Sequence, residues 1–582
     1  MRTNAKCMRP TVRMGSGAGQ AAERACVVQA PARRLCLSAL VAAAAVAAVP
    51  ATGRAAEAGG SAVGWGRNGS GQLGAGFTTQ RGLGGEASPV TVAGLSNIVE
   101  ITTGDDWTLA RLSDGTVRAW GGTNSVGELG DGEREGVVEE TVEGAEPEVI
   151  AGEEQRSTVG GLSHVKSIAA AAAHGLALLE NGDVVAWGNA QNGELGNGVA
   201  GTEIRRKNIA KEKNEPFESQ LTPKVVKSLV GRDVVAIAAG GGSDFALIDE
   251  GAATKVMAWG RNTHGQLGIG EEEKLRRGPP EICLGEVGEV PCSTIPREVE
   301  LKLPAGVKVT AVSAGSAAAF ALLSNGHVMA WGNNGKGHLG TGAKFVDFFS
   351  PQPVANLSNA VAVSSGDEDT LALLASGEVV GWGGSGNGEL GTSSATAEKE
   401  ACRGEPCHVT PQPINGLKNI AAVSAGADFS LALTNMGKVY AFGRNKFGRL
   451  GTGSLAEKSD VPTPIEGIGP VAAISAGEKH SMALLQSGVA PPVPLLSLHS
   501  GADSLLLQSR VGDRSWEPKE VKVHYHPLGH GGQKSKEFGL LGHEGSLGSL
   551  LFLGLAPEPY VVTLITGELE GMERGIAGTP EA

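Results

Sequence analysis

Short apolar runs separated by small-residue turns recur along most of the chain. In residues 471–488 an apolar run, a turn, a second apolar run and a turn glycine follow one another, and related segments begin near residues 98, 165, 234, 307, 361 and 420. Such short runs, bounded by Gly and Asn, are typical of paired β-strands and not of helices. The pattern therefore predicts an all-β chain built from repeated units.

A second motif completes each unit. It reads AWGRNTHGQLGIG in residues 258–270, and seven variants occur along the chain, each with one large aromatic residue at a fixed place. We expect these aromatic rings to fill the space between neighbouring units, and the G-x-L-G-x-G that follows to form a glycine-governed turn around one buried leucine. The aromatic residues are Trp65, Trp120, Trp187, Trp259, Trp331, Trp382 and Phe442.

Each unit is long enough for a fourth strand, which we expect at segments such as 351–354 and 411–414, where proline suits a sheet edge. Three or four strands make each unit a blade, so seven units predict a seven-bladed β-propeller over residues 59–489. The chain enters the pattern in mid-unit near Ser61 and leaves it in mid-unit at Gly488. We therefore predict that residues 60–66 pair with the strands of residues 471–488 and close the ring.

The succession of AGxxH, LAL, GxV, AWG and NxxGxLGxG over residues 60–489 resembles the regulator of chromosome condensation repeat family, whose members are typically seven-bladed β-propellers. The founder of that family exchanges guanine nucleotide on a small GTPase and docks on chromatin. A secreted bacterial protein of the same fold inhibits β-lactamases through one propeller face. The resemblance therefore implies protein binding, with nucleotide exchange and enzyme inhibition as two specific forms of it.

Residues 1–58 have the pattern of a signal peptide and leader. Arg33 and Arg34 precede an uncharged apolar run over residues 35–49, and cleavage positions follow near Ala51 and Ala58. The apolar run is too short for a typical transmembrane helix. We expect a secreted or cell-surface bacterial protein without a membrane span after cleavage; a disordered tail or a membrane anchor is the alternative.

Charge and cysteine usage agree with an exported binding protein. The net charge of −13 argues against a nucleic-acid surface, which needs basic patches. Four of the seven cysteines follow the leader, and an even number in an exported chain predicts disulfides. The close pairs are Cys283 with Cys292 and Cys402 with Cys407, each within one inter-blade loop. A zinc site is the less favoured alternative because the pairs lack C-x2-C spacing.

The repeat stops after Gly488. Residues 490–494 are a proline-rich linker, and residues 495–582 contain short strand-like runs. The run GLAPEPYVVTL around Tyr560 resembles the tyrosine corner of fibronectin type III domains, which predicts a small C-terminal β-sandwich. A disordered tail is the alternative.

Catalytic motifs are not visible in the sequence, since HExxH, G-x-S-x-G and P-loop patterns are all missing. The tract with His524, His526 and His530 is more typical of an exposed strand than of a metal site. The run Asp367–Asp369 lacks the spacing of a calcium loop. We expect no cofactor, no metal and no enzymatic activity.

The AGxxH turn varies from unit to unit, whereas the AWG and LGxG positions are strict. We predict that these turns lie on one face and bind a partner protein, with Trp107 and Phe429 as exposed apolar anchors. The candidate partner-binding residues are Asp105, Asp106, Trp107, His174, Asp244, Asp369, Asp428, Phe429 and His480.

These observations predict a secreted, monomeric, non-enzymatic scaffold that binds an extracellular or cell-envelope protein. An inhibitor of an extracellular enzyme is the first alternative. A guanine-nucleotide-exchange-type regulator, or an enzyme with a site in the central channel, is the second. Convergent acids or histidines in the channel favour an enzyme, and an exposed aromatic patch on one face favours a binding protein.

Overall fold

The computed structural model describes residues 59–79, 85–133, 157–198, 219–270, 281–285, 288–391, 401–402 and 404–488. It also describes the short strand β1 (Ala42–Ala43) and the strands of residues 497–576. Among these residues no helix has the length and apolar character needed to cross a membrane.

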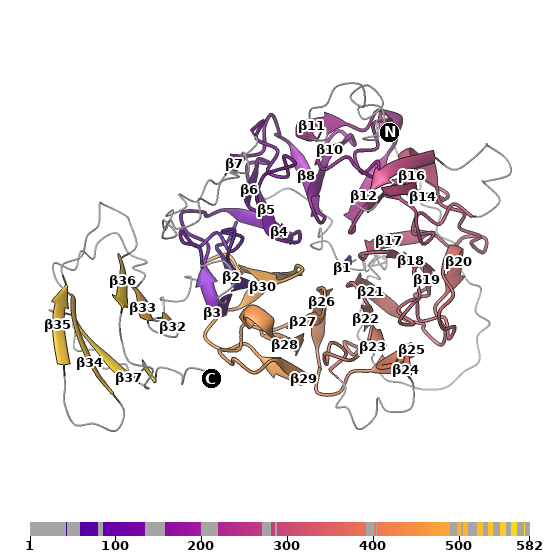
Figure 1. Ribbon diagram of the computed structural model, residues 1–582. Coiled ribbons are helices and arrows are strands. Elements are labelled where there is room, and N and C mark those ends of the chain that lie inside the picture. Colours follow the sequence, from indigo (N-terminus) through magenta and orange to yellow (C-terminus); the bar gives the residue numbers. More distant parts are fainter. Residues whose placement is uncertain are drawn as a thin grey trace, which may run out of the picture. The chain divides into compact units, whose positions relative to one another are not determined.

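The described residues between 60 and 488 form seven antiparallel sheets, and each sheet is one blade of a ring (Figure 1). Blades 1 to 7 are β4-β5-β6-β7, β8-β9-β10-β11, β12-β13-β14-β16, β17-β18-β19-β20, β21-β22-β23-β25, β26-β27-β28-β29 and β30-β31-β2-β3. The four strands of a blade are called A to D from the channel outward. The all-β seven-bladed propeller predicted from the repeat is confirmed.

The A strands are β4 (Ile98–Thr103), β8 (Val165–Ala170), β12 (Val234–Ala239), β17 (Val309–Ala314), β21 (Ala360–Ser365), β26 (Ile420–Ala425) and β30 (Val471–Ala476). The B strands are β5 (Trp107–Leu112), β9 (His174–Leu179), β13 (Ser243–Asp249), β18 (Ala318–Leu323), β22 (Asp369–Leu374), β27 (Phe429–Thr434) and β31 (His480–Leu485).

The C strands carry the aromatic of the repeat: β6 (Val117–Gly121), β10 (Val184–Gly188), β14 (Thr254–Arg261), β19 (Val328–Gly332), β23 (Val379–Gly384), β28 (Val439–Arg444) and β2 (Ala62–Arg67). The D strands are β7 (Ser157–Thr158), β11 (Gln220–Val225), β16 (Gly288–Glu298), β20 (Phe348–Pro353), β25 (Glu405–Pro413), β29 (Lys458–Pro464) and β3 (Gly85–Thr91). Two 3-10 turns, η1 (Lys227–Leu229) and η2 (Lys446–Gly448), also lie in the ring.

The ring closes through blade 7, which is built from both ends of the repeat region. Strand β2 pairs antiparallel with β31, with Trp65 opposite Ser481 and Gly66 opposite His480. This confirms the predicted pairing of residues 60–66 with the strands of residues 471–488. The N-terminal segment also supplies the outer strand β3, so it contributes two strands to the closing blade, one more than the sequence predicted. Successive A strands contact one another around the ring, with β30 against β4.

The seven aromatic residues are buried between blades, as the sequence predicted. Each tryptophan also donates its indole N–H to a backbone carbonyl in the C–D loop of the preceding blade, over 2.7–3.0 Å. The donor–acceptor pairs are Trp65–Arg449, Trp120–Gln72, Trp187–Glu128, Trp259–Glu194, Trp331–Gln266 and Trp382–His338. In the seventh interface Phe442 has no N–H, and the Ser430 hydroxyl donates to the equivalent carbonyl of Glu389 over 2.9 Å.

The glycine after the buried leucine explains why the loop motif is strict. Gly268 has a φ of +64°, and a Cβ there would lie 2.8 Å from the Trp331 indole nitrogen of the next blade. Any side chain at this position therefore meets both backbone strain and a steric clash. The leucine itself is held by the asparagine that opens the loop, because the Asn262 side chain accepts the Leu267 N–H over 3.1 Å.

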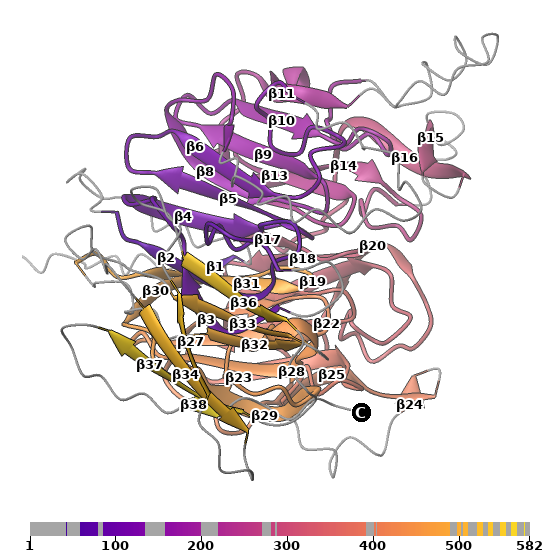
Figure 2. The same ribbon diagram turned by 60° about the vertical axis from the view of Figure 1, so that its left-hand side comes forward.

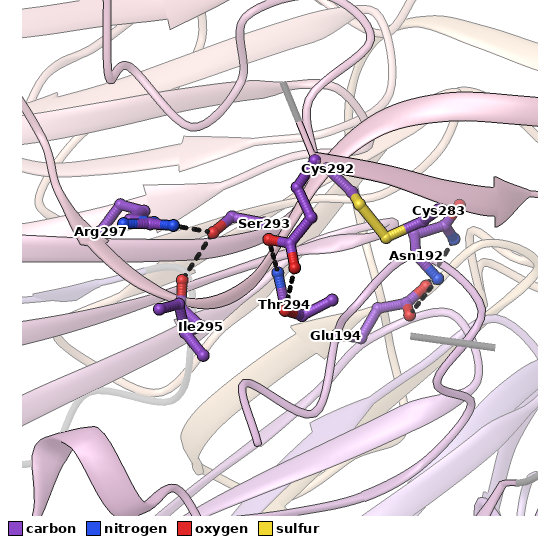
Figure 3. Close-up of a disulfide and its surroundings, with 9 residues drawn as sticks. Asn192, Glu194, Cys283, Cys292, Ser293, Thr294, Ile295 and Arg297 are labelled. Carbon is purple, nitrogen blue, oxygen red and sulfur yellow. Dashed lines mark hydrogen bonds between the residues drawn. A yellow bond between two sulfur atoms is a disulfide. The ribbon is translucent and has the colours of Figure 1, made fainter. Parts of the chain in front are cut away.

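Both predicted cysteine pairs are at bonding distance and form disulfides within hairpins of the outermost strands. Cys283 on β15 (Glu281–Gly285) is joined to Cys292 on β16, and the Ser293 hydroxyl beside it donates to the Ile295 carbonyl over 2.7 Å (Figure 3). Cys402 on β24 (Ala401–Cys402) is joined to Cys407 on β25. The two hairpins, β15–β16 and β24–β25, can be followed in Figure 2.

The predicted leader, the proline-rich linker and most of the C-terminal region lie outside the described residues. The C-terminal strands form two sheets of order β32-β33-β36 and β35-β34-β37-β38. Their bounds are β32 (Ser497–Gly501), β33 (Ser504–Ser509), β34 (Val521–Pro527), β35 (Lys534–Phe538), β36 (Gly548–Leu553), β37 (Tyr560–Thr566) and β38 (Gly575–Ile576). The fibronectin type III resemblance and the signal peptide stay predictions.

Candidate partner-binding face

One face of the propeller is built from the A–B turns and the C–D loops. In every blade the residue after the Trp-Gly or Phe-Gly pair donates its backbone N–H to the carbonyl of the third residue of the A–B turn. Gly384 donates to Glu368 over 2.8 Å, and Arg444 donates to Asp428 over 2.9 Å. This shared bond places equivalent residues of different blades in the same local frame.

The first and fourth positions of each A–B turn are fixed by packing. Six turns begin with glycine, and a Cβ on Gly366 would lie 2.1 Å from the Gly426 carbonyl oxygen of the next blade. The fourth position begins the B strand and is buried in every blade. It holds Trp107, His174, Ser243, Ala318, Asp369, Phe429 and His480.

The prediction that Trp107 and Phe429 are exposed anchors is therefore wrong. Trp107 is 1% exposed, and its indole N–H lies 3.0 Å from the carbonyl oxygens of both Ala171 and Ala172 in the next blade. Phe429 is fully buried, and the Arg449 guanidinium lies 5.6 Å from its ring centre. Both rings fill the space between two blades, so their variation from the histidine of other turns reflects packing and not recognition.

His174 and Asp244 are also interior residues. They form a buried ion pair between blades 2 and 3, with Nε2 of His174 2.9 Å from Oδ1 of Asp244. Burial alone lowers the pKa of His174, but the adjacent Asp244 carboxylate outweighs it and raises the pKa above its usual value. This pair joins neighbouring blades and is closed to a partner.

His480 and Asp369 make similar contacts between blades. His480 Nε2 lies 3.1 Å from the Thr108 hydroxyl, and burial lowers the pKa of His480 to about 4. Ser430 donates to Asp369 over 3.4 Å, while Oδ1 of Asp369 has no partner among the described residues. Burial and the negative charge of Glu389 raise the pKa of Asp369 well above its usual value.

The second position of the turn carries acids that project from the ring. Asp105 and Asp367 are exposed and Glu478 is half-buried. Loss of surrounding water, together with the negative charge of Glu478 and other acids of these turns, raises the pKa of Asp105 to about 6 and that of Asp367 to about 7. Three blades therefore bring carboxylates close enough to repel one another at the end of the channel.

The third position adds Asp106, Glu368 and Asp428, which are partly exposed and paired with basic residues. Arg67 lies 3.1 Å from Asp106, Lys336 lies 3.3 Å from Glu368, and Arg444 lies 3.0 Å from Asp428. Of the predicted partner-binding residues, only Asp105, Asp106 and Asp428 reach the surface of this face.

A ring of buried polar residues under the same face was missed by the sequence analysis. They stand before the leucine of each loop: Gln72, Glu128, Glu194, Gln266, His338, Glu389 and Arg449. In five blades the Gln or Glu side chain accepts the backbone N–H two residues earlier, as Glu389 does from Asn387 over 2.7 Å. The sequence signal was present, since this position is polar in all seven copies although it lies beside a buried leucine.

A pocket of roughly 220 Å³ opens on this face between the C–D loops of blades 4 and 5. Its charged lining is Lys336, Glu368, Glu389 and Glu405, and Gly384 and Gly386 form part of its wall. Glu405 lies in the hairpin closed by the second disulfide and forms an ion pair with Lys336.

Among the described residues no group of three or more His, Cys, Asp or Glu is arranged to hold a metal ion. Asp369 of the Asp367–Asp369 run points between blades, while Asp367 is exposed at the channel end. The side chains of the C-terminal histidine tract lie outside the described part of the chain.

Comparisons with known proteins agree with this architecture. A model of the RCC1-like domain matches residues 212–490, and models of the regulator of chromosome condensation (RCC1) repeat match residues 165–194 and 60–111. The Arabidopsis thaliana ultraviolet-B receptor UVR8 is 27% identical over 55% of this chain, and the human probable E3 ubiquitin-protein ligase HERC6 is 29% identical over 54%. The aligned part spans only 63% and 27% of these two relatives.

The crystal structure of Prp20p from Saccharomyces cerevisiae shares the fold, with a TM-score of 0.58, 22% identity, and coverage of 74% of this chain and 92% of that one. The repeat motif, the closed ring of seven blades and the matching repeat models lead to one conclusion. The chain belongs to the regulator of chromosome condensation repeat family of seven-bladed β-propellers.

Proposed function

We propose that this protein is an exported, non-enzymatic scaffold that binds a partner protein with a basic surface through the face of the A–B turns. The observation that carries the proposal is the placement of Asp105, Asp367 and Glu478 at the second turn position, where their side chains are exposed or half-buried. Loss of surrounding water and the negative charges of Asp105 and Glu478 raise the pKa of Asp367 to about 7, so the ionised acids do not stabilise the fold. A cationic partner relieves the repulsion between these charges.

The relatives support a binding role. Prp20p is described as binding Gsp1p and histones, and UVR8 is named a receptor. The ligase activity in the name of HERC6 belongs to a protein of which only 27% aligns with this chain. The signal-peptide pattern and the two disulfides support export, which places the partner outside the cell or in its envelope.

The alternative of an enzyme with a channel site has one point in its favour, which is the convergence of acids at the channel end. The described pocket, however, lies between C–D loops, and the described residues offer no cluster suited to a metal. A binding surface explains the exposed acids without a further catalytic group.

The test uses affinity capture from culture medium and cell envelope with the full chain and a triple variant, Asp105→Asn, Asp367→Asn and Glu478→Gln. We expect the triple variant to capture at least tenfold less partner than the wild type does. The melting temperature of the triple variant should not be lower than that of the wild type. Capture by the wild type should weaken as salt rises from physiological to about 0.5 M, because screening shortens the reach of exposed charges.

The matched control changes three carboxyls at the opposite ends of the strands, Asp183→Asn, Glu250→Gln and Glu378→Gln. It should bind as the wild type does. If the control loses the partner, or if the triple variant keeps it with the same salt dependence, the face has been assigned wrongly.

A further inference from the structure

We propose that the pocket beside Gly384 receives an arginine side chain of the partner protein. This inference rests on the proposed partner-binding face and names one specific contact on it. It derives from the internal repeat of the propeller, which in blade 6 places its own arginine, Arg444, opposite the acid of the A–B turn.

The occupant is indicated by blade 6. Gly384 and Arg444 follow the aromatic-glycine pair of their blades, and each donates its N–H to the third residue of the A–B turn. In blade 6 the Arg444 guanidinium reaches the carboxylate of that residue, with Nη1 3.0 Å from Oδ2 of Asp428. In blade 5 the acid is present as Glu368, but Gly384 has no side chain to meet it. The pocket therefore opens where the repeat elsewhere places a guanidinium.

The pocket is also short of positive charge. Lys336 is the one cation of its lining, and it is shared by Glu368 and Glu405. Glu389 is 2% exposed and accepts hydrogen bonds from backbone N–H groups, that of Asn387 over 2.7 Å, while no side chain of the described residues bonds to it. Its Oε1 lies 3.2 Å from the place of a Cβ on Gly384, so it faces the empty volume. Burial raises the pKa of Glu389 to about 7, and a bound cation would lower it.

Arginine fits this site better than other cations. Its planar guanidinium donates to two carboxylates at once and is less costly to desolvate than an ammonium group. A volume of roughly 220 Å³ is below the ~300–1,000 Å³ of pockets for whole small-molecule ligands, which suits a single side chain.

The experiment follows the amide resonances of Gly384, Gly386 and Asn387 in the full chain during titration with N-acetyl-arginine amide. We expect saturable shifts with a dissociation constant on the order of 1–10 mM. N-acetyl-citrulline amide, which has the same shape without the charge, should give no saturable shift. N-acetyl-lysine amide should bind at least fivefold more weakly. Equal binding of lysine, or no binding of arginine, overturns the proposal.

Two variants check the location. Gly384→Arg places the missing arginine in the chain itself and should abolish binding without lowering the melting temperature, since the blade 6 backbone accepts arginine there. Glu368→Gln should weaken binding at least tenfold, and Glu378→Gln, on the opposite face of the same blade, should leave it unchanged. Unaltered binding in both pocket variants overturns the proposal.

The same variants separate this inference from the proposed function. One outcome is that Gly384→Arg loses binding of the arginine probe and still captures the partner. In that case the pocket binds a guanidinium group but does not contact the partner, so this inference fails while the proposed function stands. If the triple variant of the A–B turns keeps the partner, the proposed face fails whatever the pocket binds.

Discussion

Replacing His338 by glutamine should stabilise the propeller, and more so in acid. His338 stands at the buried polar position before the loop leucine, where five other blades use Gln or Glu to accept a backbone N–H two residues earlier. His338 is 4% exposed, and neither ring nitrogen has a hydrogen-bond partner in the described residues. A glutamine at this position can accept the backbone N–H of Lys336, as the Gln or Glu of those five blades accepts the equivalent N–H.

The magnitude follows from two contributions. A buried polar group without a partner costs about 1–3 kcal/mol, so His338→Gln should raise the free energy of unfolding by about that amount at pH 7.5. Burial also lowers the pKa of His338 to about 4 from 6.5. The unfolded state then binds a proton below pH 6.5 that the folded state refuses until about pH 4, so stability is lost as the pH falls through that window. At pH 5 the loss amounts to about 2 kcal/mol, at 1.36 kcal/mol for each pH unit.

The assay is chemical denaturation of wild type and variant at pH 7.5 and pH 5.0, followed by tryptophan fluorescence. The gain from His338→Gln should be larger at pH 5.0, because the variant lacks the titrating group. The His480 ring contributes in the same direction in both proteins, since its pKa is also about 4, and cancels in the difference. Wild type and variant could instead have the same free energy of unfolding at pH 7.5 and lose the same amount of it at pH 5.0. That result would show that the ring nitrogens of His338 find hydrogen-bond partners.

Further predictions concern other contacts between blades. Trp107→Ala should cost about 3–5 kcal/mol of stability, whereas Phe345→Ala, at a half-exposed ring, should cost less than 1 kcal/mol; equal melting losses would refute the interior role of Trp107. Asp244→Asn should cost about 3–5 kcal/mol because it leaves His174 in a buried pair without its counter-charge, as unfolding curves at pH 6 would reveal. Asp367→Asn should raise the melting temperature at pH 8 but not at pH 4. The folded-state pKa of Asp367 is about 7, so its carboxyl loses its stabilising contribution as the pH rises through 7. An equal gain in melting temperature at both pH values contradicts this. Thiol titration of the denatured, unreduced mature protein should find no free thiol in the repeat region, and four thiols would refute both disulfides.

The fold was predictable because the residues that pack between blades recur in every copy of the repeat. The aromatic of AWG and the glycine of LG meet across every blade interface, so both must recur wherever a blade recurs. Counting half-units was enough to predict that β2 completes blade 7, because a propeller leaves no other partner for that strand. The second N-terminal strand, β3, was missed since the outer strands of the blades share little sequence.

The A–B turns do lie together on one face, as predicted, but the two side chains predicted as exposed anchors are buried. Variation at the fourth turn position was interpreted as recognition, whereas Trp107, His174 and Phe429 are three solutions to one packing problem between blades. Sequence alone does not distinguish a position that varies because it is free from one that varies together with a neighbour in the next blade. The His174–Asp244 pair is of the second kind, and its partners stand 70 residues apart.

The same distinction decides where function is to be sought in a repeat protein of this type. Positions that every blade needs are strict, and a position buried between two blades can vary together with its contact in the next blade, as at the His174–Asp244 pair. What remains are positions such as Asp367, which stands among like charges, and Gly384, where no arginine faces Glu368 and the single Lys336 ammonium is shared by Glu368 and Glu405. Folding gains nothing from either residue. A partner that brings positive charge to this face gives both a physical reason, and the Gly384→Arg variant tests it, because it supplies that charge from within the chain.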